Sequence, residues 1–231
     1  MKRLLLISQL TLLPQLFIAA VAMAGITNTG VIVGGDCVHG NGVRKTVERK
    51  AAEFNMLETS GAFNVLIKSG AFKQQIKITG DANLLPLITT NSQGNKLMIT
   101  TAKSICTELT ITLEISVANL EALVTNGSDT IKAQGIDTHK FVLDMGGSSD
   151  VELSGSAEVF EASISGAGDL NAKNLKTKGS ALNISGTGTA NVYATDKLKV
   201  DIMGVADVNY FGHPKKIEKQ ILGVGNLNAM D

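Results

Sequence analysis

A glycine recurs about every 19 residues through the second half of the chain, and this spacing limits the fold more than any other feature. Successive members of the series are 20, 19, 20, 18 and 19 residues apart. The series consists of Gly127, Gly147, Gly166, Gly186, Gly204 and Gly223. A short fixed period points to an architecture built from one repeated unit, so all other assignments depend on it.

The positions around the glycine repeat with it. Two residues before it stand Thr125, Met145, Ile164, Ile184, Ile202 and Ile221, which are apolar after the first. Two residues after it stand Asp129, Ser149, Gly168, Gly188, Ala206 and Gly225, nearly all small. The next position holds Thr130, Asp150, Asp169, Thr189, Asp207 and Asn226. It is followed by the apolar column of Ile131, Val151, Leu170, Ala190, Val208 and Leu227.

A unit of this length is too short for a two-helix hairpin and is typical of one coil of a β-solenoid. Strands of successive coils would pair at about 4.8 Å, with the apolar columns facing inward. The glycines predict corners, because a corner needs either a positive φ or a close backbone approach that a Cβ opposes. The aspartates, threonines and asparagines fit turns, because their side chains can bond nearby backbone amides.

The first half of the chain is also rich in strands. Apolar and polar residues alternate in four stretches, separated by turn residues, at 62–68, 75–79, 96–101 and 108–116. One short helical turn is expected near 81–88. We therefore predict an all-β protein in which a β-rich first half is continuous with the coils.

Residues 1–24 have the pattern of a cleavable signal peptide. Lys2 and Arg3 precede an apolar run that ends in Ala22-Met23-Ala24. A membrane anchor is the alternative, but polar residues interrupt the run. We expect an exported protein of the periplasm or cell surface, with an irregular glycine-rich leader at 25–45. A single β-solenoid domain at 46–231 would follow, with its repeats at 121–231.

Charge and cysteine content bear on the partners of the protein and on the compartment in which it works. The chain carries 21 basic and 21 acidic residues and no Trp. It therefore lacks the basic, aromatic surface that nucleic-acid binding requires, and nucleic acid is not an expected partner. Cys37 and Cys106 either form a disulfide in an oxidising compartment or remain separate thiols. The sequence leaves both alternatives open.

Several motifs in order resemble the head GIN domain family of putative auto-transporter adhesins. They are "EFNMLETSGAFNVLIKSG", "ITGDANLLPLITTNSQGNKLMIT" and the series of units like "SGAGDL", which together cover roughly residues 45–231. The resemblance implies an exported, right-handed β-helical protein of the cell envelope or surface. It implies no catalytic residue.

Catalytic and cofactor motifs do not match. "GAGDLN" lacks the third glycine of a dinucleotide loop, and its near-copies "GTGTAN" and "GVGNLN" make a single-use site implausible. His39, His139 and His213 are far apart, with no nucleophile elbow and no clustered zinc ligands. We therefore expect a protein that is not an enzyme, with its histidines at solvent-facing turns.

Calcium is the one cofactor that the repeat itself suggests. In a regular solenoid Asp150 and Asp169 stack at about 5 Å, where like charges repel and a cation would relieve them. Asp207 occupies the same column, but threonines and Asn226 dilute it. We favour turn capping and keep calcium as the alternative.

The leading functional hypothesis is a non-enzymatic surface module for adhesion or assembly, whose partner is an envelope or surface protein or a glycan. The alternative is a carbohydrate-binding or carbohydrate-active protein that uses the Asp column or a lysine-rich face. That face comprises Lys173, Lys176, Lys178, Lys197, Lys199, Lys215, Lys216 and Lys219. An uncapped last coil would also allow self-association through that end.

Overall fold

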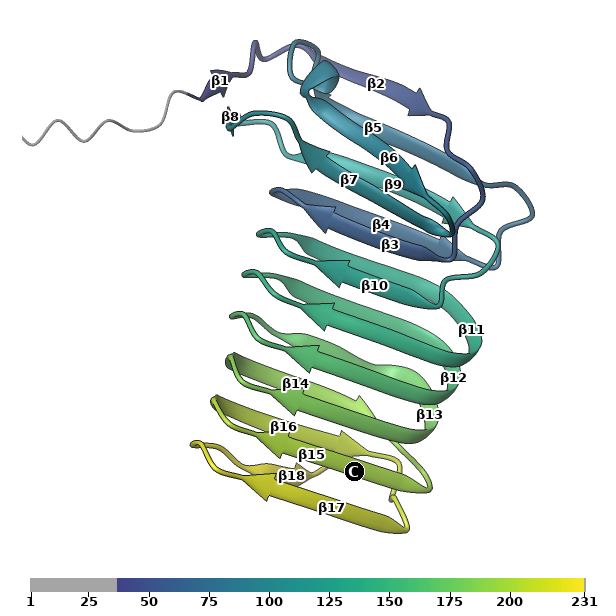
Figure 1. Ribbon diagram of the computed structural model, residues 1–231, viewed down its shortest axis with the longest axis vertical. Coiled ribbons are helices and arrows are strands. Elements are labelled where there is room, and N and C mark those ends of the chain that lie inside the picture. The colour runs from purple at the N-terminus through teal and green to yellow at the C-terminus, as the bar shows by residue number, and fades with distance from the viewer. Residues whose placement is uncertain (1–36, 231) are drawn as a thin grey trace, which may run out of the picture. The chain divides into compact units, whose positions relative to one another are not determined.

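In the computed structural model, which describes residues 37–230, nearly all regular structure is β-strand (Figure 1). The strands of the first half are β1 (Val38–His39), β2 (Arg44–Arg49), β3 (Met56–Ser60), β4 (Phe63–Ser69), β5 (Gln75–Asp81), β6 (Ile88–Gln93), β7 (Lys96–Thr101), β8 (Ile105–Cys106), β9 (Ile111–Val117) and β10 (Ala122–Thr125). Those of the second half are β11 (Thr130–Met145), β12 (Asp150–Ile164), β13 (Leu170–Ile184), β14 (Thr187–Tyr193), β15 (Lys197–Ile202), β16 (Val205–Phe211), β17 (Lys216–Ile221) and β18 (Leu227–Ala229). One 3-10 turn, η1, spans Leu85–Leu87.

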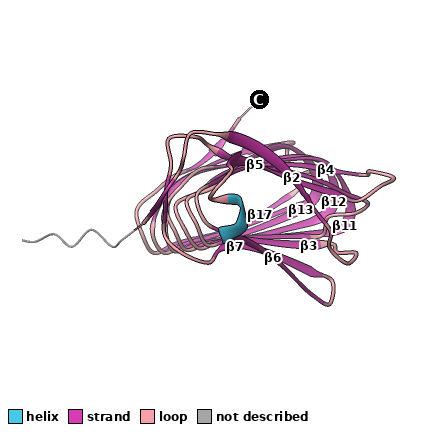
Figure 2. Ribbon diagram, turned by 90° about the horizontal axis from the view of Figure 1, so that it is seen from above, coloured by secondary structure: helices cyan, strands magenta, loops and turns pink. Residues whose placement is uncertain are grey.

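The strands form two parallel ladders within one large sheet of 16 strands. Ladder A runs through β9, β4, the first parts of β11, β12 and β13, and then β14, β16 and β18. Ladder B runs through β7, β3, β10, the second parts of β11, β12 and β13, and then β15 and β17. The two ladders face each other across the interior (Figure 2).

The register of the ladders follows the columns read from the sequence. In ladder A, Ile131 pairs with Val151, Val151 with Leu170, and the column continues through Ala190 and Val208 to Leu227. In ladder B, Met145 pairs with Ile164, and the column continues through Ile184 and Ile202 to Ile221. These side chains point inward because every second residue of a strand faces the same side.

The interior is an apolar core that runs along both ladders. Leucine, isoleucine and valine predominate in it, and the buried rings of Phe141 and Phe160 lie 6.2 Å apart between their centroids. β-branched and leucine side chains suit these positions because they pack well on a pleated surface. Burial of the apolar surface of these side chains is the main driving force for the formation of the stack.

The first half contributes two further levels, but not in chain order. β3 and β4 lie next to β10 and β11, and β7 and β9 lie beyond them. The predicted strands at 62–68, 75–79, 96–101 and 108–116 are confirmed as β4, β5, β7 and β9, and the expected helical turn as η1. The β-rich first half therefore shares its sheet with the second half.

Antiparallel strands close the N-terminal end of the stack. β5 pairs with β9, β2 pairs with β5, and β6 pairs with β7, all antiparallel. Figure 2 shows η1 above the space between the two ladders, and its Leu85 is buried in the core. At the other end, β17 and β18 each pair with one neighbour only among the described strands.

The leader predicted as irregular at 25–45 needs a correction in its described part. β1 and the first residues of β2 lie within it. They are ordered by partners far along the chain, since β1 pairs with β8 and β2 with β5. The signal peptide predicted at 1–24 lies outside the described residues. The described residues, 37–230, form one compact unit, and none of the helices among them is long and apolar enough to span a membrane.

Candidate functional site

The glycine column marks where one level of the stack touches the next. A Cβ added at Gly166 would lie 1.8 Å from the carbonyl oxygen of Gly147, and one at Gly186 would lie 1.8 Å from that of Gly166. The carbonyl oxygen of each of these glycines accepts a hydrogen bond from the backbone amide of the residue that follows the next glycine. For example, the Ala167 amide donates to the Gly147 oxygen at 2.9 Å. Of the two reasons predicted for these glycines, close approach applies, because none of the six has a positive φ.

The aspartate column caps the turns between levels. Oδ1 of Asp150 accepts from the Asp169 amide at 3.1 Å, and Oδ1 of Asp169 accepts from the Thr189 amide at 2.8 Å. Asp207 accepts from both the backbone and the side-chain amide of Asn226, at 3.0 and 2.9 Å. Each exposed carboxylate therefore bonds the backbone of the following level.

These aspartates do not form a ligand set of their own. Within residues 37–230, no three His, Cys, Asp or Glu side chains lie close enough to hold one metal ion. Asp150 and Asp169 follow each other, but the column then passes through Thr189 before it reaches Asp207. The geometry agrees with turn capping and leaves calcium as an expectation for experiment.

Asp129 is a buried polar centre that the sequence did not indicate. It is 2 % exposed and accepts hydrogen bonds from the Thr59 hydroxyl at 2.7 Å, the Phe63 amide at 2.9 Å and the Thr125 hydroxyl at 2.9 Å. Ser149, also buried, donates or accepts within the same network. A buried carboxylate needs such a full set of donors. Asp129 therefore joins the first half of the chain to the repeats.

The lysine-rich face is largely neutralised by acids. Among the lysines proposed for it, Lys178, Lys197, Lys199, Lys215 and Lys216 form ion pairs with Glu158, Asp196, Asp201 and Glu218. Most of these pairs join adjacent levels. Because surface pairs contribute little stability, their main effect here is to cancel charge. A continuous positive ladder for acidic glycans is therefore not what this face presents.

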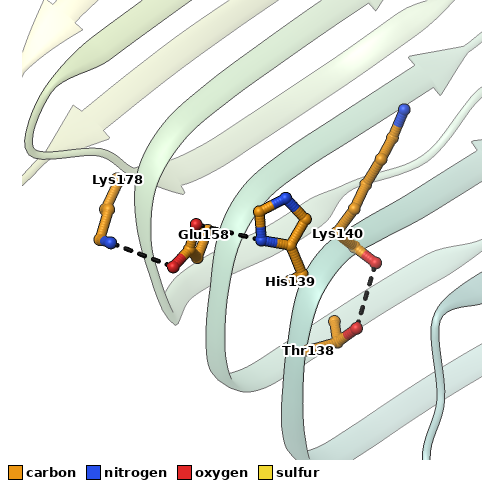
Figure 3. Close-up of polar contacts among 5 residues, drawn as sticks. All are labelled: Thr138, His139, Lys140, Glu158 and Lys178. Carbon is orange, nitrogen blue, oxygen red and sulfur yellow. Dashed lines mark hydrogen bonds and ion pairs between the residues drawn. The ribbon is translucent and has the colours of Figure 1, made fainter.

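The bend between the two ladders carries the charge cluster drawn in Figure 3. Glu158 lies between Lys178 and His139, at 3.1 and 3.0 Å. The Lys178 hydrogen bond and charge, with His139 as a smaller influence, hold the pKa of Glu158 below its usual value. His139 is 79 % exposed. This position agrees with the prediction of a solvent-facing histidine.

A shallow cavity of 350 Å³ lies beside this cluster, lined in part by Lys176, Thr177 and Tyr193. The Lys176 ammonium stands 3.8 Å from the centre of the Tyr193 ring. A cation at this distance is attracted by the ring face and covers it. The aromatic surface of this cavity is therefore already occupied by the protein itself.

The two cysteines form a disulfide, Cys37–Cys106, with Cα atoms 5.6 Å apart. It ties β1 to β8, next to His39. His213 lies in a different turn, where it has a positive φ of 54°. His39, His139 and His213 thus stay apart in space, as their positions in the sequence suggested.

Comparisons with known proteins identify the family. The family model described as "Putative auto-transporter adhesin, head GIN domain" matches residues 53–214. No curated protein matches the chain. A putative adhesin from Bacteroides fragilis NCTC 9343 has a similar solved structure, with 20% identity, coverage of 84% of this chain and 100% of that one, and a TM-score of 0.69.

A second solved structure is that of a putative lipid binding protein from Parabacteroides distasonis ATCC 8503. It has 22% identity, covers 85% of this chain and 100% of its own, and has a TM-score of 0.54. Identities of this size show that the all-β fold is shared, and the family model covers well over half of the chain. The chain therefore belongs to the putative auto-transporter adhesin, head GIN domain family.

Proposed function

We propose that the protein is a non-enzymatic, exported β-solenoid of right-handed type that serves adhesion or assembly at the cell envelope or surface. The observation that carries the proposal is the register of the two ladders. Residues 18 to 20 positions apart pair in parallel from β11 to β18, and the same columns extend into β4 and β3. A single solenoid domain at 46–231 accounts for this pattern.

The roles of the repeated residues support a scaffold. The glycines allow close contact between levels, and Asp150, Asp169 and Asp207 bond backbone amides. The residues that the repeat singles out thus maintain the stack itself. In such a scaffold, function resides in side chains that the repeat does not fix.

Export is supported by the pattern of residues 1–24 and by the disulfide, because disulfides persist in oxidising compartments. The mature protein would work in the periplasm or on the cell surface. Its partner would be an envelope or surface protein or a glycan. The balanced charge of the chain argues against nucleic acid.

Cell fractionation of a bacterial host that makes the full chain tests the proposal. We expect the mature chain to begin after Ala24, to be in the envelope or outside the cell, and to make coated beads adhere to bacterial or host surfaces. A chain that keeps its first 24 residues and stays in the cytoplasm would refute the proposed location. Failure of coated beads to bind any surface would refute the proposed adhesion.

A turnover screen on polysaccharides tests the non-enzymatic part. Release of reducing ends by the purified mature chain, lost on heat inactivation, would show that the protein is a carbohydrate-active enzyme instead. We expect no release.

A further inference from the structure

A groove at the N-terminal end of the stack has a composition unlike the rest of the surface. It has a volume of 460 Å³ and is lined by the segment before β3, the loop between β4 and β5, the turn between β6 and β7, and the residues after β9. Its lining includes Glu53, Phe54, Asn55, Phe72, Asn95 and Asn119. None of these residues belongs to the glycine repeat.

Phe72 presents a bare aromatic ring to this groove. Its exposure of 113 % is the highest of any large apolar side chain in the described residues. The neighbouring Phe54, by contrast, is 6 % exposed. Single exposed apolar side chains are common on protein surfaces, so this ring is of interest because it lines a groove together with polar side chains. Unlike Tyr193, Phe72 has no cation over its face among the described side chains.

The loop that carries Phe72 is fixed by its backbone. Gly70 N–H donates to the Ala118 carbonyl at 3.1 Å, and Ala71 N–H donates to the Val117 carbonyl at 3.0 Å. The Gln74 amide donates to the carbonyls of Ala51 and Ala52. The ring is therefore presented by an ordered loop, which lowers the entropic cost of binding.

A chain of amides forms the floor beside the ring. Glu121 accepts from Asn55 at 2.6 Å and from Asn119 at 2.8 Å, and the Asn55 oxygen accepts from Asn95 at 2.6 Å. These bonds fix the planes of the amides. The side-chain oxygen of Asn119 is buried and has no donor from the protein.

A second cavity of 490 Å³ lies next to the groove and shares Glu53 and Gln74 with it. Arg49, Lys50 and Lys73 line that second part. Oriented amides, carboxylate and guanidinium groups along a groove, with one aromatic face, match a ligand that has many hydroxyls and an apolar ring face. A sugar ring has both, and the two neighbouring cavities give room for more than one.

We propose that this groove binds a stretch of glycan chain, with one sugar ring packed on Phe72 and its hydroxyls bonded to the exposed side chains of Asn95 and Glu53. This inference rests on the proposed adhesive function and assigns to it a partner class and a site. It differs from the Asp column and the lysine-rich face, since both of those are used within the protein.

A glycan array with the purified mature chain, followed by calorimetric titration of the bound glycans, tests the proposal. Phe72→Ala and Asn95→Ala change exposed side chains, so we expect unaltered thermal unfolding and at least a tenfold loss of affinity. Leu222→Ala is the matched control, because Leu222 is 72 % exposed on the last turn, in the C-terminal part of the chain. It should bind like the wild type.

Each outcome separates this inference from the general function. No glycan binding by the wild type, or equal binding by Phe72→Ala, overturns the groove as a glycan site. If coated beads still adhere in that case, the adhesive function stands without this site. If adhesion depends on Phe72, is abolished by protease treatment of the target surface and survives periodate oxidation of its glycans, the partner is a protein and the glycan assignment is wrong.

Discussion

Replacement of Gly166 by alanine tests the close approach between levels directly. The new Cβ would lie 1.8 Å from the Gly147 carbonyl oxygen, whereas real Cβ atoms do not approach closer than 3.0 Å. The Cβ would be fixed to the backbone of one level and would meet the backbone of the level before it. Backbone atoms cannot rotate away as a flexible side chain can. The two levels must therefore separate locally by more than the slack that packing allows.

The cost follows from the bonds that cross this contact. The Ala167 amide donates to the Gly147 oxygen at 2.9 Å, and a separation of about 1 Å would take that pair beyond hydrogen-bond range. Loss of one or two ladder bonds, with local backbone strain, gives about 3 to 5 kcal/mol of destabilisation. In a chain of this size that corresponds to a fall of roughly 10 °C in the thermal midpoint.

Urea denaturation of the mature chain measures the effect, with Gly179→Ala as the matched control. At Gly179 an added Cβ would meet nothing closer than the Lys197 carbonyl oxygen at 3.9 Å. That variant should keep or slightly raise the unfolding free energy, because alanine restricts the unfolded chain by about 0.4 to 1 kcal/mol. Equal midpoints for Gly166→Ala and Gly179→Ala would refute the close-approach argument.

Three further predictions follow from other positions. Asp129→Ala should cost about 3 kcal/mol in urea denaturation, since two buried hydroxyls and one amide lose their acceptor, while the exposed Asp144→Ala should cost less than about 0.5 kcal/mol. Asp169→Ala should lower the thermal midpoint slightly and equally with calcium or chelator; calcium stabilisation seen only in the wild type would instead show a cation site. Lys219→Val should produce concentration-dependent oligomers in sedimentation, whereas Lys216→Val and the wild type stay monomeric. A monomeric Lys219→Val would show that the ammonium group of Lys219 does not block pairing at the edge of β17.

Periodicity was sufficient to predict which residues pair in the second half of the chain. Because each level follows the previous one in the chain, residues that stack are separated by one period, and the column of Ile131, Val151 and Leu170 could be aligned from the sequence. The same logic placed Asp150 and Asp169 at turns. The periodicity could not show which backbone amides donate to these two carboxylates, since a carboxylate can cap its own turn or bond the next level.

The first half could not be ordered in this way. Gly61 is a further member of the glycine column, as a Cβ on Gly127 would lie 2.2 Å from its carbonyl oxygen. The strands from β4 to β10 intervene between Gly61 and Gly127 in the chain, so no period relates the two residues. The partners of Asp129 are missed for the same reason, because Thr59 lies 70 positions earlier. The only hint of these partners in the sequence is that Thr125 stands in a column that is otherwise apolar.

The C-terminal end shows how a single residue can limit a repetitive fold. In ladder B one inward column is filled by Leu97, Leu57, Leu123, Leu143, Ala162, Leu182 and Val200, and its last member is Lys219. The apolar members are all buried, and Lys219 is exposed at the open edge of β17. An inward charge on an edge strand opposes pairing with another strand, because pairing would bury the ammonium group without a partner.

Leu222 and Val224 expose apolar surface in the last turn, so contact area for association is present there. We therefore expect the charge of Lys219 to oppose the self-association that the exposed apolar surface of Leu222 and Val224 would favour.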